Sequence, residues 1–570
     1  MSIIGLKKAN CKNCYKCLKV CPVKSIQFES GQAKIIDNVC ILCGHCLAEC
    51  PQNAKTLSSD LHKVRGFLKA GDKVVVSLAP SYAGSFDYCT PGQLAAAMKK
   101  LGFAAVSETS EGAAYVTDAY YKLIKEGSMR NIITTCCPSI NRLAELYYPD
   151  VVDCLAPVVS PMIPHARLLK QNLGKNIRVV FAGPCISKIA EADDIRHDTE
   201  VDAVLTFDDL LFWFREERID PAECEEGSFL NASSKILRMY PVTDGILASL
   251  RARGDVDNYR LLSVDGVEEC KELFEAISRG EIDRCFVEVN ACKGSCVNGP
   301  VKAKDVYSRF SSRLKVEQYA KSDCDVYPVL SEGLPLSMKF FDRSPHNLMP
   351  SEEEIRAILR KIGKDTPEQE LNCGSCGYPS CRDKAIAVYQ NRAELTMCVP
   401  YMKERAESLS NYVLSETPNI TLIVDSDLNI IEFNSAAEKC FGVSRHEALQ
   451  KSLYELIDVS DFQYVFESKQ SISNKKVHYK EYNITTEQSI IYIAQENIAM
   501  GIFKDITDEE AKEESRYKMR VDTMEMAQKV IDKQMIAAQQ IASLLGETTA
   551  ETKVTLTKLK NMIVFDGDER

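Results

Sequence analysis

Eight cysteines near the start of the chain fall into two runs with the same spacing. Each run has the pattern Cys-x2-Cys-x2-Cys-x3-Cys-Pro, and the eight positions are Cys11, Cys14, Cys17, Cys21, Cys40, Cys43, Cys46 and Cys50. Three closely spaced thiolates suit three irons of one cube, and the fourth points back toward a second cube. A pair of zinc knuckles is the alternative, but structural zinc does not need the trailing Cys-x3-Cys-Pro. The spacing therefore predicts two 4Fe–4S clusters and electron transfer.

This spacing is that of two-cluster bacterial ferredoxins, and residues 1–66 are the predicted ferredoxin domain. The crossed arrangement gives each cluster one ligand from the other run. One cluster is expected on Cys11, Cys14, Cys17 and Cys50. The other is expected on Cys40, Cys43, Cys46 and Cys21.

Composition favours metal ligation for the remaining cysteines as well. No apolar run approaches the roughly 20 residues that span a bilayer, and Met1–Asn10 has no apolar signal core. We therefore expect a cytoplasmic protein, in which the 24 cysteines stay reduced and do not form a disulfide framework. The net charge of -11 argues against general nucleic-acid binding. The 570 residues suggest about four folded units.

Residues 67–345 alternate β-branched runs with helical patterns. Strands are predicted at Lys73–Leu78, Asn131–Thr135 and Arg178–Ala182, and an amphipathic helix at Pro91–Lys100. Such alternation predicts an α/β domain with parallel strands. Ligands of these folds gather at the C-terminal ends of the strands.

Three cysteine-containing segments follow strand-like runs in this domain. They are Thr134–Pro138 (TTCCP), Pro184–Glu191 (PCISKIAE) and Glu288–Cys296 (EVNACKGSC). Singly, Cys185 or Cys292 would be taken for a buried structural thiol. In this order, after a ferredoxin unit, the segments resemble the three signature motifs of the iron-only (FeFe) hydrogenases, over roughly residues 1–300.

The resemblance implies an H-cluster, which is a 4Fe–4S cube joined to a two-iron subsite with CO and cyanide ligands and a bridging dithiolate. Its implied ligands are Cys137, Cys185, Cys292 and Cys296, with Cys296 bridging the two parts. The implied reaction is the reversible cleavage of dihydrogen into two protons and two electrons, which would leave through the ferredoxin clusters.

Further residues take roles by the same resemblance. Lys188 would donate hydrogen bonds to a cyanide of the subsite, and Cys136 would pass protons, helped by a thiol pKa of about 8.5. Four residues are expected to pack beside the subsite: Ala79, Pro80, Ser81 and Pro184.

The chain departs from the catalytic pattern around this site. The changed positions are Ile140, Met162, Gly183, Asn290, Ser295 and Pro300. The helix Tyr115–Leu123 has tyrosine or leucine where catalytic relatives place glutamates, and Ala156 stands near the position of a serine. A proton relay needs groups within hydrogen-bond reach. Either protons use another route, with Glu191 or Glu288 as candidates, or turnover is slow. The alternative for both glutamates is a structural role, in which the carboxylate forms a hydrogen bond or an ion pair and carries no protons to the site.

Residues 346–405 contain a further four-cysteine pattern. Its members are Cys373, Cys376, Cys381 and Cys398, which follow a predicted helix at Ser351–Lys361. Four thiolates suit a third additional 4Fe–4S cluster, and structural zinc is the alternative. The spacing resembles small four-cysteine domains in electron-transfer proteins of anaerobes.

Residues 406–507 resemble a PAS domain. Ile420–Val424 and Ile430–Phe433 predict a β-hairpin around an Asp/Asn turn. Strands are also expected near Lys476–Thr485 and Ser489–Gln495, and a last one ends at Phe503. Cys440 is expected in the core and His446 on the surface.

Residues 508–570 are predicted to form a signalling coiled coil and a C-terminal helix. The seam positions alternate by four and three residues: Tyr517, Val521, Met524, Gln528, Ile531, Met535, Ala538, Ala542 and Leu545. This pattern favours a coiled-coil homodimer, although a helix packed on its own PAS core is the alternative. Gly546 is expected to end this helix, and a short helix to cover Glu551–Met562.

The fold class is thus a multidomain α/β and α+β protein, and three functions compete. The first is a sensory FeFe-hydrogenase of low turnover that relays redox state to a PAS and coiled-coil output. A separate kinase or phosphatase would bind this output and respond to it. The second is a catalytic hydrogenase exchanging electrons with ferredoxin. The third is an iron–sulfur assembly protein, against which the retained cluster cysteines and Lys188 argue. No nucleic-acid or membrane partner is expected.

Overall fold

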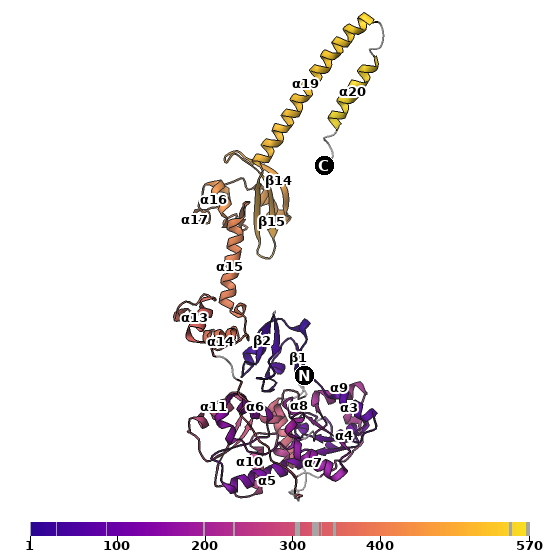
Figure 1. The fold of residues 1–570 in the computed structure, drawn as a ribbon, viewed down its shortest axis with the longest axis vertical. Coiled ribbons are helices and arrows are strands. Elements are labelled where there is room, and N and C mark those ends of the chain that lie inside the picture. Colours follow the sequence, from indigo (N-terminus) through magenta and orange to yellow (C-terminus); the bar gives the residue numbers. More distant parts are fainter. Residues whose placement is uncertain are drawn as a thin grey trace. The chain divides into compact units, whose positions relative to one another are not determined.

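The computed structural model describes residues 2–29, 31–86, 88–197, 200–231, 234–302, 308–321, 330–331, 333–345, 349–545 and 550–565. The chain divides into two compact units, Met1–Met402 and Lys403–Arg570. Figure 1 shows the elements of both units coloured along the sequence.

The first residues form a small domain with two antiparallel strand pairs. They are β1 (Ile4–Leu6) with β4 (Lys55–Leu57), and β2 (Ile26–Glu29) with β3 (Gln32–Ile35). Each cysteine run winds into a short helix, α1 (Lys16–Val20) or α2 (His45–Ala48). Both helices begin after a residue with positive φ, Tyr15 or Gly44, so the chain turns sharply before Cys17 and Cys46.

Two parallel sheets form the centre of the next domain, as the alternating pattern predicts. One has the order β6-β5-β8-β9, with β5 (Val74–Leu78), β6 (Ala105–Glu108), β8 (Arg178–Gly183) and β9 (Ala203–Thr206). The other has the order β10-β11-β7, with β7 (Ile132–Ile133), β10 (Arg260–Asp265) and β11 (Cys285–Asn290). The strand predicted at Asn131–Thr135 is shorter than expected. The amide of Thr135 donates its hydrogen bond to the Tyr120 hydroxyl and not to a carbonyl of a neighbouring strand.

Helices connect and cover these strands (Figure 1). They are α3 (Leu61–Lys69), α4 (Pro91–Lys100), α5 (Ser110–Glu126), α6 (Pro138–Tyr147), α7 (Met162–Leu173), α8 (Ser187–Ala192), α9 (Phe207–Glu216), α10 (Gly245–Arg253), α11 (Val267–Ser278) and α12 (Arg309–Lys321). Helix α4 has the predicted bounds because Thr90 forms a capping box with Gln93 and Pro91 opens the first turn.

Residues 349–402 add two helices, α13 (Glu352–Arg360) and α14 (Cys381–Tyr389). Ser351 caps α13 through a capping box with Glu354, so this helix begins one residue after the predicted start. Tyr378, Ala387 and Met397 share a buried core with Leu18 and Ile26 of the first domain. The four-cysteine segment is therefore packed against the ferredoxin-like domain.

The second unit contains a five-stranded antiparallel sheet of order β13-β12-β16-β15-β14. Its strands are β12 (Ile420–Val424), β13 (Ile430–Phe433), β14 (Ile472–Tyr479), β15 (Ile484–Ile493) and β16 (Ile498–Asp505). Three short helices accompany it: α16 (Ser435–Phe441), α17 (Arg445–Ala448) and α18 (Ser460–Ser468). The first hairpin is confirmed, whereas the strand predicted at Lys476–Thr485 is wrong. A turn divides that segment, with Asn483 at a φ of 52°.

One long helix precedes this sheet in the sequence, and two follow it. They are α15 (Val399–Glu416), α19 (Thr507–Leu545) and α20 (Ala550–Phe565). Helix α19 begins ten residues before the predicted Tyr517, while Gly546 lies outside the described residues. Cys440 packs at the edge of the core of this unit, and His446 is exposed, as expected. A helix with the length and apolarity to cross a membrane is not found in the described part of the chain.

Candidate functional site

The three cysteine motifs meet at the C-terminal ends of the parallel strands. Cys136 and Cys137 follow β7, Cys185 follows β8, and Cys292 follows β11. A cavity of about 350 Å³ brings together the four thiols implied as H-cluster ligands, which are Cys137, Cys185, Cys292 and Cys296. Burial raises the pKa of each of these thiols, that of Cys185 to about 11.

A second cavity of about 660 Å³ adjoins the first. Every residue expected around the two-iron subsite lines it: Ala79, Pro80, Ser81, Cys136, Pro184 and Lys188. Cys185 and Cys296 border both cavities. The residues expected for the cube and for the subsite therefore surround two neighbouring spaces that share these two thiols.

The walls of both cavities fit a bound iron–sulfur group. Ser295 Oγ beside the smaller cavity and Ser81 Oγ beside the larger one are buried and lack a hydrogen-bond partner among the described residues. Buried hydroxyls are ordinarily satisfied. Two unpartnered hydroxyls on walls rich in soft thiol ligands fit a polar cofactor with iron and sulfide.

Lys188 is a buried cation at the edge of the larger cavity. Its Nζ lies 2.6 Å from Glu191 Oε2, 2.6 Å from Ser160 Oγ and 3.3 Å from the carbonyl oxygen of Cys136. Burial opposes the charge of this lysine, but the Glu191 carboxylate outweighs it and raises the Lys188 pKa. Glu191 therefore keeps Lys188 protonated and fixes its direction.

The side chain of α5 that contacts Cys136 is a tyrosine and not a carboxylate. Tyr120 OH lies 3.4 Å from Cys136 Sγ and 3.3 Å from Thr135 Oγ1. Burial raises the Tyr120 pKa well above its ordinary value, so this phenol is a poor proton donor at neutral pH. Tyr120 therefore stands next to Cys136, on the helix where catalytic relatives were expected to carry glutamates.

The two glutamates considered as substitutes have structural partners. Glu191 pairs with Lys188, and Glu288 accepts hydrogen bonds from the amides of Ile246 and Leu247 at the start of α10. Burial raises the pKa of Glu288 to about 8. These bonds favour the structural alternative for both carboxyls.

The ferredoxin-like domain approaches the thiol cavity through its second cysteine run. Cys43 lines the 350 Å³ cavity beside Cys292 and Cys296. Gly44 permits this approach, because a Cβ at that position would lie 2.5 Å from Pro300 Cβ. Its φ of +80° also favours glycine.

Thiols of the two cysteine runs lie near one another in this domain. Burial raises the pKa of Cys43, and the charges of Cys21, Cys46 and Cys40 add to that effect. Burial likewise raises the pKa of Cys17, with additions from Cys11 and Cys50. The division of the eight thiols into two crossed ligand sets stays a prediction.

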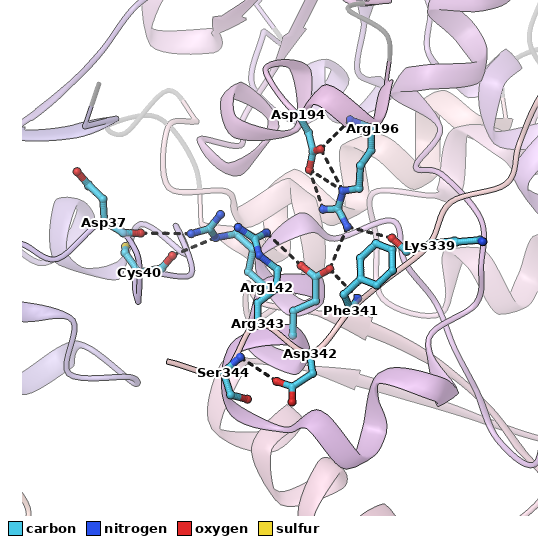
Figure 2. Close-up of polar contacts among 11 residues, drawn as sticks. Asp37, Cys40, Arg142, Asp194, Arg196, Lys339, Phe341, Asp342, Arg343 and Ser344 are labelled. Atoms are coloured by element: carbon cyan, nitrogen blue, oxygen red, sulfur yellow. Dashed lines mark hydrogen bonds and ion pairs between the residues drawn. The ribbon is translucent and has the colours of Figure 1, made fainter. Parts of the chain in front are cut away.

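Arg142 joins the two domains, and no sequence pattern pointed to it. Its Nε donates to the carbonyl oxygen of Cys40 at 3.0 Å and its Nη2 to that of Asp37 at 3.3 Å (Figure 2). Nearby, Tyr147 OH donates to the carbonyl oxygen of Val39 at 2.6 Å. Helix α6 starts directly after Cys137, so these bonds hold the Cys40 loop against the Thr134–Pro138 segment.

The third cysteine set also surrounds a cavity of about 350 Å³. Its lining includes Cys373, Cys376, Cys381 and Cys398. Buried Lys384 lies on the same wall and donates to the carbonyl oxygen of Leu395 at 3.0 Å. Burial lowers the pKa of Lys384, and the negative charge of a thiolate-bound cluster in this cavity would favour its protonated form.

Sequence comparisons match four families along the chain. The C-terminal domain of the iron-only hydrogenase large subunit matches residues 72–300, and a 4Fe-4S dicluster domain matches residues 3–51. An Fe-S cluster family matches residues 369–400, and a PAS domain matches residues 418–508.

Curated relatives include the NADP-reducing hydrogenase subunit HndD of Solidesulfovibrio fructosivorans, with 27% identity over 47% of this chain and 56% of that protein. Iron hydrogenase 1 of Clostridium pasteurianum is 25% identical over 44% of this chain and 53% of that protein. The chain thus spans about half the length of these relatives. Among solved structures, an FeFe-hydrogenase of Chlamydomonas reinhardtii covers 50% of this chain and 100% of its own, with 19% identity and a TM-score of 0.42.

The family matches and the cysteine geometry agree on the central domain. The match over residues 72–300 includes all three motifs that converge on the paired cavities. Residues 72–300 therefore belong to the iron-only (FeFe) hydrogenase family, in a chain that also carries a 4Fe–4S dicluster domain and a PAS domain.

Proposed function

We propose that this chain is a sensory FeFe-hydrogenase, which cleaves dihydrogen reversibly at low turnover and passes its redox state to a PAS and coiled-coil output. The observation that carries the proposal is the pair of adjoining cavities, lined by Cys137, Cys185, Cys292, Cys296 and Lys188. When bound there, the H-cluster would supply the heterolytic cleavage of dihydrogen. The four thiols would hold it, and Lys188 would hydrogen-bond its subsite.

The position of the other cysteine sets supports electron flow away from this site. Cys43 lies on the wall of the thiol cavity, and Cys376 lies in the segment packed on the ferredoxin-like core. Burial raises the pKa of Tyr378 to about 12, and both Cys376 and Cys21 add to this effect. Three additional 4Fe–4S clusters on these sets would connect the active site with the segment preceding the PAS domain.

The surroundings of Cys136 support low turnover, since Tyr120 stands where a carboxylate would feed it. The PAS match and α19 support a signalling output, which we assign to a separate kinase or phosphatase and to a homodimer through α19. A cytoplasmic location accords with these partners. Exchange of electrons with ferredoxin, and the PAS domain as a regulatory or dimerisation module, form the second candidate function.

Infrared spectroscopy of the matured full chain tests the cofactor. We expect CO and cyanide bands that shift when argon is replaced by dihydrogen, because the H-cluster carries those ligands. A matured sample without such bands would refute the hydrogenase proposal. Dihydrogen uptake comparable to that of a fast catalytic relative in the same assay would refute the sensory part.

Replacing Cys398 with serine tests the third cluster separately. We expect loss of one reduced 4Fe–4S signal in electron paramagnetic resonance, with the infrared bands unchanged, because Cys398 lines only the third cysteine cavity. Cys440→Ser is the matched control, since this partly buried cysteine belongs to the PAS core. Unchanged iron content in Cys398→Ser would contradict the assignment.

A further inference from the structure

His165 on α7 is a fully buried histidine that the proposed site does not use. Its Nδ1 lies 2.7 Å from Ser77 Oγ, and its Nε2 lies 3.0 Å from Ser107 Oγ. Ser77 and Ser107 are opposite each other in the register of β5 and β6. The imidazole therefore spans two adjacent parallel strands, with one hydroxyl on each ring nitrogen.

One of these hydroxyls continues toward the active site. Ser77 Oγ lies 2.8 Å from Thr109 Oγ1, and Thr109 lines the 660 Å³ cavity together with Cys136 and Lys188. The row His165–Ser77–Thr109 thus ends on the cavity wall. Ser107 contacts the opposite ring nitrogen and forms a side branch of this row.

The other end of the row approaches solvent through Glu111. Its Oε2 lies 3.8 Å from His165 Nε2, and its side chain is 28% exposed. Asn231 Nδ2 donates to the same oxygen at 2.9 Å, which holds the carboxyl near the ring. The gap of 3.8 Å must shorten to hydrogen-bond length when a proton passes between Glu111 and His165.

We propose that Glu111, His165, Ser77 and Thr109 form a proton route between solvent and the active-site cavity. This inference rests on the proposed function, and the route takes the place of the carboxylates missing behind Cys136. A proton taken up by the Glu111 carboxylate passes to His165 Nε2, while the proton on Nδ1 passes to Ser77. Ser77 passes its own proton to Thr109, which releases one into the cavity. One proton enters and one leaves, and the ring then carries its proton on Nε2 in place of Nδ1. Reorientation of the imidazole between Ser77 and Ser107, together with rotation of the hydroxyls, must restore the starting arrangement before the next transfer.

The protonation states of the two titrating groups suit such a route. Burial lowers the pKa of His165 to about 3, so the ring stays neutral and keeps one nitrogen free to accept a proton. Burial raises the pKa of Glu111 above its ordinary value. A carboxyl whose pKa lies closer to neutrality exchanges protons more readily at working pH.

The two serines give a matched test, because both are fully buried and both contact the same ring. In matured protein we expect Ser77→Ala to lower dihydrogen uptake by roughly 100-fold, the lower end of the contribution of a positioned proton-transfer group, and to raise its solvent deuterium isotope effect. Ser107→Ala should change neither by more than about twofold, since the row bypasses Ser107. Equal effects of the two substitutions would overturn the proposal.

A second pair tests the solvent end of the route. Glu111→Gln should also lower uptake and raise the isotope effect, whereas Glu126→Gln, at the exposed end of the same helix, should not. An unchanged isotope effect in Glu111→Gln would remove this residue from the route.

Nitrogen-15 resonance of histidine in the cofactor-free full chain gives a readout independent of turnover. We expect a neutral His165 ring between about pH 5 and 8, with the Nδ1 signal altered by Ser77→Ala and the Nε2 signal by Ser107→Ala. A ring that becomes cationic in this range would overturn the route. Infrared bands separate the two failures: parent protein without CO bands refutes the hydrogenase, whereas intact bands with equal serine effects refute only the route.

Discussion

Cys296→Ala is expected to abolish the CO and cyanide infrared bands and to lower dihydrogen uptake by more than about 100-fold. Cys296 borders both cavities, so its thiolate would hold the proposed H-cluster where the two spaces meet. Loss of residues that only support metal ligands already costs about 10–100-fold in affinity or activity. Loss of a shared ligand should cost more. Infrared spectra and dihydrogen uptake of matured protein measure both effects.

Cys285→Ala is the matched control for this substitution. Cys285 is a buried cysteine on β11 whose Sγ donates to the carbonyl oxygen of Asp283 at 3.4 Å, and it lines neither cavity. It should retain the bands and the uptake. The electron paramagnetic resonance signals of the ferredoxin clusters should persist in both variants. Retention of the CO bands in Cys296→Ala would contradict the assignment of this thiol.

Much of the fold followed from local sequence signals. The run Val74–Leu78 is apolar and β-branched, and it forms a buried parallel strand where the pattern predicts one. The helices predicted at Pro91–Lys100 and Ser351–Lys361 form within one residue of those starts, and in each a capping box between residues three apart fixes the first turn. Such signals need no knowledge of distant contacts.

Other elements were misplaced because their boundaries depend on less regular patterns. The predicted strand Lys476–Thr485 ignored a turn that has no glycine or proline and is made instead by Asn483 at positive φ. Helix α19 starts at Thr507, but its first ten residues are mostly charged and show no apolar periodicity. The heptad pattern marks only the apolar seam that begins at Tyr517, so it cannot locate the charged first turns of the helix.

The candidate site shows the same division between local and distant information. The resemblance to FeFe-hydrogenases, carried by cysteine spacing and motif order, pointed to the thiols and Lys188 that line the two cavities. By contrast, the His165–Ser77 contact joins residues 88 positions apart, and the Arg142–Cys40 contact joins residues 102 apart. A lone histidine or arginine carries no spacing signal, so these contacts appear only once the sheet and α6 are in place.

Lys188→Met is expected to destabilise the hydrogenase domain and to lower dihydrogen uptake together. The substitution leaves the Glu191 carboxylate buried without its partner, and breaking a buried ion pair from one side costs about 3–5 kcal/mol. It also removes the hydrogen-bond donor expected at the two-iron subsite. Lys122→Met is the control, because its pair with Asp118 has a lysine that is 70% exposed. Such a pair should contribute less than about 1 kcal/mol.

The double variant Lys188→Met/Glu191→Leu separates the two effects. Removing both charges leaves no uncompensated carboxylate, so the free energy of unfolding should return toward that of the parent protein. Dihydrogen uptake should stay low, and the cyanide bands should differ from those of the parent protein, because the ammonium remains absent from the cavity wall. Thermal unfolding, infrared spectra and uptake of the same preparations give the comparison. Recovery of uptake along with stability would show that Lys188 acts only by neutralising Glu191, and its assignment as a donor to the cofactor would then be wrong.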